Sequence, residues 1–290
     1  MKPDRPSNTA LVVAAGLQLA YAHAALPADT QRCGDRLLRR AYPRLAGLLR
    51  QGWFRQLCRL AERVTLPGIC LHFALRKRLL RRHAWDAIAA GCKQVVVLGA
   101  GLDTLCLELK AAGTSLACIE IDHPATQAVK RAATGVKGVD FIAADLARQD
   151  VGALLAAHPD FYAGASTLFV AEGLLMYLPL SAVRALFARI AAVAPGCRVA
   201  FTWLEPLADG RPNFRRRSRL VDAWLRWHGE PFLSGVARPA LAAFLAEAGF
   251  VLDHVNASGE LLDNLDVRER PLEGEYVALA RHDARMAAST

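Results

Sequence analysis

The sequence lacks the cysteine and histidine spacings that are typical of metal centres. Its seven cysteines include no Cys-x-x-Cys pair, and no group of cysteines and histidines has the spacing of a zinc site. An odd, scattered set of cysteines is typical of reduced thiols in a cytosolic protein. We therefore predict no metal site and a cytoplasmic location.

Long apolar runs are also missing. The apolar stretch Ala10–Leu17 is too short to span a bilayer, so no membrane-spanning segment is predicted. Basic residues before it and the small-residue triplet 22–24 after it have the outline of a secretory signal. Asp4 and Gln18 interrupt that outline. We therefore prefer the alternative, in which a helix begins at residue 8 or 9 and runs to about residue 25.

A glycine turn follows the strongest strand pattern, but the third glycine of a dinucleotide site is absent. Val95–Leu98 is apolar and β-branched, as is typical of a strand buried on both faces of a parallel sheet. Gly99 and Gly101 follow it, and Thr104 stands where Gly-x-Gly-x-x-Gly requires glycine. This absence disfavours an NAD-dependent reductase. It favours a ligand with an adenosine but no pyrophosphate, such as S-adenosylmethionine.

Two acidic residues mark the end of the next strand. Leu116–Ile121 is apolar apart from Glu120, and Asp122 follows it, about 20 residues after Gly99. At this place in a nucleotide-binding βαβ unit, an acidic side chain accepts hydrogen bonds from the ribose hydroxyls. The pattern therefore predicts a ribose site at these acids.

Strand and helix patterns alternate from residue 94 onward, which predicts an α/β protein with a doubly wound sheet. Two late strands after a helix suit a seven-stranded sheet whose last strand is antiparallel. An insertion at residues 205–238 lies between the fifth strand and that helix, and a loop of this length is usually functional or flexible. The predicted strands are Val95–Leu98, Leu116–Ile121, Val139–Ala143, Ser166–Ala171, Arg198–Leu204, Phe250–Val255 and Glu275–Ala280.

The first third of the chain is predicted to be a helical cap, residues 1–93, ahead of a second domain at 94–290. Further helices are expected at 32–50, 52–64 and 69–90. The cap holds 17 basic and 5 acidic residues, a net +12, whereas the remainder carries −3. Such asymmetry can steer a carboxylate substrate, an acidic carrier protein, RNA or an anionic membrane, although arginines can also simply solvate helix faces.

Four linked motifs resemble one known family. Gln94–Thr104, Glu120–Pro124, Ala144–Leu146 and Ala171–Tyr177 follow the order and spacing of the leucine carboxyl methyltransferase family, which includes many bacterial small-molecule O-methyltransferases. The resemblance covers nearly the whole chain, and residues 8–11 resemble the bacterial branch. It implies a class I methyltransferase (Rossmann-like) sheet under an N-terminal helical cap, with S-adenosyl-L-methionine as cofactor.

The resemblance also implies cofactor contacts, position by position. They are Gly99 and Gly101 at the methionine part, Asp122 with Glu120 at the ribose, Asp145 and Leu146 at the adenine, and Glu172 at the amino-acid end. Arg76 resembles the arginine that binds the cofactor carboxylate, with Lys77 and Arg78 as alternatives. Leu105 stands where the family frequently has arginine, and the cap shows no residues associated with recognition of a protein C-terminus. The substrate is therefore not carried over.

The implied chemistry is a methyl transfer by direct displacement, in which the enzyme aligns and desolvates the acceptor. A carboxylate acceptor needs no base near pH 7, whereas a hydroxyl acceptor does. Tyr177 and His228 are the candidate catalytic residues. We expect a small, acidic acceptor, free or bound to a carrier protein, because the cap offers many arginines to a carboxylate.

Two functions of other kinds remain as alternatives. One is an RNA-binding or tRNA-modifying methyltransferase that uses the basic cap. Trp53 and Phe54 fall at apolar helix positions, so we expect them in the core rather than as stacking platforms, which makes nucleic acid a less favoured partner. The other is a catalytically silent scaffold that binds the cofactor.

Overall fold

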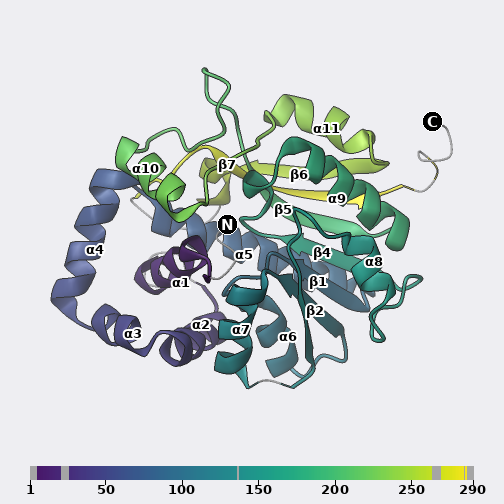
Figure 1. Cartoon of the computed structure of the whole chain (residues 1–290), viewed down its shortest axis with the longest axis horizontal. Coiled ribbons are helices and arrows are strands. Elements are labelled where there is room, and N and C mark those ends of the chain that lie inside the picture. Colours follow the sequence, from purple (N-terminus) through teal and green to yellow (C-terminus); the bar gives the residue numbers. More distant parts are fainter. Residues whose placement is uncertain (1–4, 21–25, 136, 263–268, 284, 286–290) are drawn as a thin grey trace.

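The computed structural model describes residues 5–20, 26–135, 137–262, 269–283 and 285. A seven-stranded sheet crosses it in the order β3-β2-β1-β4-β5-β7-β6 (Figure 1). β1 to β5 are parallel, and β7 runs antiparallel to both β5 and β6. The predicted doubly wound α/β fold is confirmed. The strands are β1 (Gln94–Leu98), β2 (Ala117–Asp122), β3 (Val139–Ala143), β4 (Thr167–Ala171), β5 (Arg198–Leu204), β6 (Phe250–Ala257) and β7 (Glu275–His282).

The central strand β1 is buried along its whole length. Val96 and Leu98 belong to one hydrophobic cluster, whereas Val95 and Val97 belong to another. Side chains alternate between the two faces of a strand, so this division shows that both faces of the sheet are covered. The continuous apolar run of the sequence follows from that double burial.

The helices largely match the predicted ranges, with one break that the periodicity does not show. The single helix expected at 32–50 is two helices, because Tyr42 (φ −139°, ψ 68°) precedes Pro43 and a residue before proline is disfavoured in the helical region. The helices of the cap are α1 (Asn8–Ala20), α2 (Ala28–Ala41), α3 (Pro43–Leu49), α4 (Gly52–Thr65) and α5 (Ile69–Ala89).

The remaining helices follow the first strand. Among them, α10 forms within the predicted insertion, and two single 3-10 turns flank it in the sequence. They are α6 (Leu105–Ala111), α7 (Pro124–Thr134), α8 (Val151–Ala156), α9 (Leu180–Val193), α10 (Arg219–His228) and α11 (Arg238–Ala246), with the turns at Leu175–Tyr177 and Ser258–Leu262.

The cap packs onto the sheet through α5. Leu71 and Leu75 of this helix share a cluster with β1 and β4, and Leu79 and Leu80 share the second cluster with the opposite face of β1. The division at residue 93 stays a prediction. The first helix ends at Ala20 in the described chain, and the triplet 22–24 lies outside the described residues. None of the helices described has the length and apolarity needed to cross a bilayer.

Candidate functional site

The carboxyl ends of the first four strands of the chain meet at one edge of the sheet, as parallel strands must. Their loops line a cavity of about 770 Å³, a volume typical of a small-molecule site. Residues of α1 and α5 in the cap, and of the insertion around α10, form the rest of the cavity wall. Predicted residues that do line it are Arg76, Gly99, Gly101, Asp122, Asp145, Leu146, Glu172 and Tyr177.

The glycine turn after β1 has no room for side chains. Gly99 (φ 64°) and Gly101 (φ 48°) both adopt the left-handed backbone that glycine tolerates best. A Cβ at Gly99 would lie 2.8 Å from Cδ1 of Leu174, and one at Gly101 would lie 3.1 Å from Cβ of Ala10 in α1. The turn therefore fits closely beneath the first helix while its backbone faces the cavity.

Asp122 stands at the end of β2, beside this turn. Its Oδ2 accepts a hydrogen bond from the backbone N–H of Gly101 at 2.9 Å. Burial raises the pKa of its carboxyl group above the usual value. His123, the next residue, also lines the cavity. The acid is thus fixed in orientation at the predicted ribose position.

Glu120 does not line the cavity, contrary to the sequence-based prediction. Its side chain is fully buried, and Nζ of Lys130 lies 2.5 Å from its Oε2. Residues two apart in a strand point to the same face, so Glu120 lies on the face of Asp122 but deeper in the sheet. Spacing along the sequence cannot distinguish these two depths.

A buried chain of ion pairs surrounds Arg76. Its Nη1 lies 2.8 Å from Oε2 of Glu275, and its Nε donates to Glu172 at 3.1 Å. Although burial alone would lower it, the two carboxylates raise the pKa of Arg76 above its usual range. Nε2 of His72 lies 2.6 Å from the same Glu275. Arg76 therefore lines the cavity with its charge already matched by carboxylates of the chain.

Lys77 extends this chain toward the glycine turn. Its Nζ lies 2.5 Å from Oδ2 of Asp103 and 2.7 Å from Oε2 of Glu172. Burial alone would raise the pKa of Asp103, but the charge of Lys77 lowers it to about 2. Asp103 lies within the motif Gln94–Thr104, so the sequence offers a signal for a place at the site, whereas nothing in the sequence singles out Glu275.

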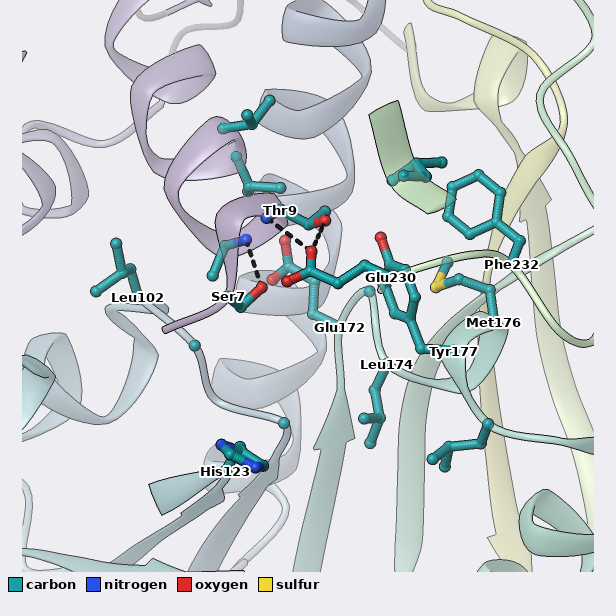
Figure 2. A pocket seen from close by; sticks show the side chains of 18 of the residues that line it. Ser7, Thr9, Leu102, His123, Glu172, Leu174, Met176, Tyr177, Glu230 and Phe232 are labelled. Atoms are coloured by element: carbon teal, nitrogen blue, oxygen red, sulfur yellow. Dashed lines mark hydrogen bonds between the residues drawn. The ribbon is translucent and has the colours of Figure 1, made fainter. Parts of the chain in front are cut away.

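The insertion contributes Glu230, which the sequence-based prediction missed. Its two carboxylate oxygens accept hydrogen bonds from the backbone N–H groups of Asn8 (3.0 Å) and Thr9 (2.9 Å) and from the Thr9 hydroxyl. Figure 2 shows Glu230 beside Tyr177, reaching the first turn of α1. A carboxylate here satisfies free helix N–H groups and complements the helix dipole. Glu230 therefore holds α1 over the cavity.

The two predicted catalytic residues lie in different settings. Tyr177 lines the cavity next to Phe232, with ring centroids 5.4 Å apart, and burial raises its pKa well above the usual value. His228 does not line the cavity. Its Nδ1 lies 2.8 Å from the carbonyl oxygen of Trp224, and its ring packs against that indole. His228 thus contacts Trp224 within α10 and is absent from the cavity lining, so its predicted catalytic role is not supported.

Charged and apolar residues occupy different parts of the cavity wall. Among the residues that the structure describes, six carboxylates and three cations line it: Asp103, Asp122, Asp145, Glu172, Glu230 and Glu275, against Arg76, Lys77 and Arg148. The apolar wall comes from the cap, the turn after β4 and the insertion: Ile69, Phe73, Met176, Phe214, Trp224, Leu225 and Phe232. The strand-end side is therefore polar and net negative, whereas the opposite side is largely apolar and includes Glu230 of the insertion.

Residues 30–191 match the family described as leucine carboxyl methyltransferase, a match that spans the second helix to the ninth. The chain belongs to the leucine carboxyl methyltransferase family. A relative in Mycobacteroides abscessus is 34% identical over 73% of this chain and 69% of its own length. One in Mycobacterium avium is 32% identical over 69% of this chain and 64% of its own length. Both are provisionally named S-adenosyl-L-methionine-dependent methyltransferases.

Solved structures agree on the fold of this family member. A provisionally named methyltransferase from Thermobifida fusca matches with a TM-score of 0.58 and 16% identity, over 86% of this chain and 94% of that one. The chain is therefore an S-adenosyl-L-methionine-dependent methyltransferase with the class I fold. Family membership confirms the predicted cofactor and enzyme class.

Proposed function

We propose that this methyltransferase transfers the methyl group to a hydroxyl oxygen of a small, largely apolar molecule. The observation that carries the proposal is the division of one cavity into a net-negative side at the strand ends and an apolar side beneath the cap and insertion. The first side suits a charged nucleoside cofactor. The second suits an organic acceptor whose body excludes water.

The residues of the polar side fit S-adenosylmethionine. When bound, this cofactor supplies an electrophilic methyl group on a sulfonium. The turn at Gly99 and Gly101 leaves bare backbone for its methionine part, and Asp122 is placed to accept the ribose hydroxyls. Asp145 and Leu146 would border the adenine. An excess of carboxylates complements the sulfonium and the ammonium.

Glu172 and Arg76 would hold the amino-acid end of the cofactor. In the structure they pair with each other at 3.1 Å. A cofactor ammonium can join Glu172 and a cofactor carboxylate can join Arg76, so that each charge keeps a partner. This preformed pair spares the free enzyme an uncompensated buried charge, which would be costly.

The cavity does not favour the acidic acceptor that the sequence suggests. Of the three cations among the described lining residues, Arg76 and Lys77 are already paired with carboxylates of the chain. Arg148 has a side chain that is 86% exposed. An anionic acceptor would therefore meet more negative than positive charge, so a neutral hydroxyl compound is the better fit.

A hydroxyl acceptor must lose its proton during methyl transfer. Tyr177 is a poor base, because its raised pKa keeps it protonated, but it can donate a hydrogen bond to the acceptor oxygen. Glu230 lies next to Tyr177 and accepts hydrogen bonds from Thr9 (Figure 2). We assign Glu230 as the proton acceptor, instead of the His228 that the sequence analysis predicts.

The test is a methyl-transfer assay with radiolabelled S-adenosylmethionine on matched pairs of aromatic compounds, each a phenol and the corresponding carboxylic acid. We expect transfer to the phenol of a pair to be faster by about tenfold or more. Faster transfer to the carboxylic acids would contradict the hydroxyl assignment. Titration calorimetry with the cofactor alone tests the polar side separately.

A further inference from the structure

Helix α4 exposes an apolar stripe to solvent. Trp53 is 60% exposed, Leu57 54%, Leu60 58% and Val64 68%. Their spacing of four, three and four residues places them along one side of the helix. Trp53 is therefore not a core residue, contrary to the sequence-based expectation, and no residue of α4 is buried.

The helix packs on the core through a different side. Phe54 and Cys58 are half-buried against the main hydrophobic cluster, whereas the stripe faces away from it. Helices of globular proteins normally turn their broadest apolar face to the core. A continuous exposed apolar face indicates an interaction site.

Basic residues accompany the stripe. Arg55, Arg59 and Arg63 are on the same helix, and within the described part of the chain none of them forms an ion pair. Glu62 is the helix's single acid, and its Oε1 accepts a hydrogen bond from the N–H of Cys70. The combination of tryptophan, leucines and unpaired arginines is typical of a helix that lies in the interface of a membrane.

Helix α10 continues this surface. Leu220 is 69% exposed and Trp227 75%, seven residues apart on one side of the helix. The start of α10 is joined to the end of α4, because the N–H of Ser218 donates to the carbonyl of Thr65 at 2.9 Å. Figure 1 shows the two helices next to each other at one side of the molecule.

The charges select among the occupants of this surface. A second copy of the chain would bring arginines against arginines. An RNA would bind arginines but has little use for a stripe of aliphatic side chains. We propose that α4 and α10 dock this methyltransferase onto the surface of an anionic lipid bilayer, with the apolar residues entering the headgroup region and the arginines binding lipid phosphates.

Docking there would bring the cavity close to the lipid. Thr65 and Leu66, at the end of α4, line the cavity, and so do Leu220 and Trp224 of α10. An apolar acceptor dissolved in the bilayer could then enter between the two helices. Only this consequence rests on the proposed function, since the docking itself does not depend on methyl transfer.

Vesicle flotation with the full chain tests the proposal. Binding to phosphatidylcholine vesicles that contain phosphatidylglycerol should exceed binding to pure phosphatidylcholine and should weaken as salt rises. The double variant Leu57→Ser/Leu60→Ser should bind at least about tenfold more weakly. The double variant Arg59→Gln/Arg63→Gln should lose most of the preference for the anionic lipid.

The matched control is Tyr162→Ser/Leu180→Ser, which removes two exposed apolar side chains (62% and 39% exposed) outside α4 and α10. Circular dichroism verifies that each variant is folded. Unchanged binding by Leu57→Ser/Leu60→Ser, or an equal loss in the control, would overturn the proposal. So would a dimer in sedimentation velocity that this variant dissociates while wild-type protein ignores vesicles, because the surface would then belong to a second copy.

Discussion

Arg76 and Glu275 form a fully buried ion pair, with Nη1 2.8 Å from Oε2, although 199 residues separate them in the sequence. The pair joins the cap helix α5 to the start of the last strand, β7. It fixes the guanidinium at the cavity wall. Several properties of the enzyme should depend on this arrangement.

Replacement of Arg76 should weaken cofactor binding. Arg76→Ala removes the group that we assign to the cofactor carboxylate, and we expect at least a tenfold loss of affinity, about 1.4 kcal/mol. Arg81→Ala is the matched control on the same helix, because Arg81 binds Asp29 and Glu108 and does not line the cavity. Titration calorimetry compares the two. Equal affinities would remove the assignment of Arg76.

The same substitution should also destabilise the fold. Loss of Arg76 leaves the carboxylates of Glu172 and Glu275 buried with less positive charge nearby, which costs about 3–5 kcal/mol when one partner of a buried pair is removed. Urea unfolding measures this loss. A variant as stable as the wild type would show that water or rearranged side chains compensate for the missing charge.

Asp122 should be specific to the ribose. Asp122→Ala should weaken S-adenosylmethionine binding by roughly 1–3 kcal/mol, because the ribose hydroxyls lose a buried acceptor. Glu120→Gln is the comparison: Glu120 pairs with Lys130 below the cavity, so this change should lower stability more than affinity. Calorimetry and urea unfolding on both variants separate the roles. The reverse ranking would show that Glu120 holds the cofactor.

Acid should destabilise the protein below about pH 4. Burial alone would raise the pKa of Glu275, but Arg76 and His72 lower it to about 2, and that of Asp103 is also about 2. A lowered carboxyl pKa stabilises the fold above the unfolded-state value and loses this contribution as the pH falls toward the folded value. Burial raises the pKa values of Glu120 and Asp122, so these groups take up protons in the folded protein first as the pH falls. Their protonation stabilises the fold and offsets part of the loss from Glu275 and Asp103 until the pH falls below the unfolded-state values. Urea midpoints should therefore change little from pH 7 to 5 and fall steeply below about 4.

Loss of the Glu230 carboxylate, which holds α1 over the cavity, should reduce catalysis more than cofactor binding. Glu230→Ala removes the acceptor of two backbone N–H groups and of the Thr9 hydroxyl, a loss of about 1–2 kcal/mol for a helix cap. We expect kcat to fall more than cofactor affinity. Thr9→Val keeps the carboxylate and removes one hydrogen bond, so it should retain most of the activity. A Glu230→Ala enzyme with normal kcat would exclude both proposed roles of Glu230, as the residue that holds α1 and as the proton acceptor.

Much of the fold follows from local patterns in the sequence. Each of the seven predicted strands exists, because buried parallel strands such as β1 need continuous apolar runs that stand out from amphipathic helices. The break between α2 and α3 at Tyr42 could also be predicted from the sequence, because Pro43 disfavours a helical conformation in the residue before it. The amphipathic pattern of residues 52–64 correctly predicts helix α4, but periodicity alone does not show whether its apolar face packs on the core or faces solvent.

The site was only partly predictable. Residues next to a strand end, such as Asp122 and Asp145, follow from the topology because parallel strands finish at a common edge. Glu230 and Glu275 do not, because their places depend on how α1 and β7 pack against distant segments. His228 illustrates the same limit: only Gly229, where α10 ends, lies between His228 and Glu230, yet Glu230 lines the cavity and His228 does not.

The position of α1 links the stability of this helix to the shape of the cavity. The backbone N–H of Ser7 donates to Oγ1 of Thr126 at 2.9 Å, and Ala10 would lie within 3.1 Å of a Cβ at Gly101. Ser7, Thr9 and Ala10 also line the cavity, so the first turn of α1 is part of the cavity wall. A substitution that displaces this turn would therefore change the shape of the cavity as well as the stability of the helix.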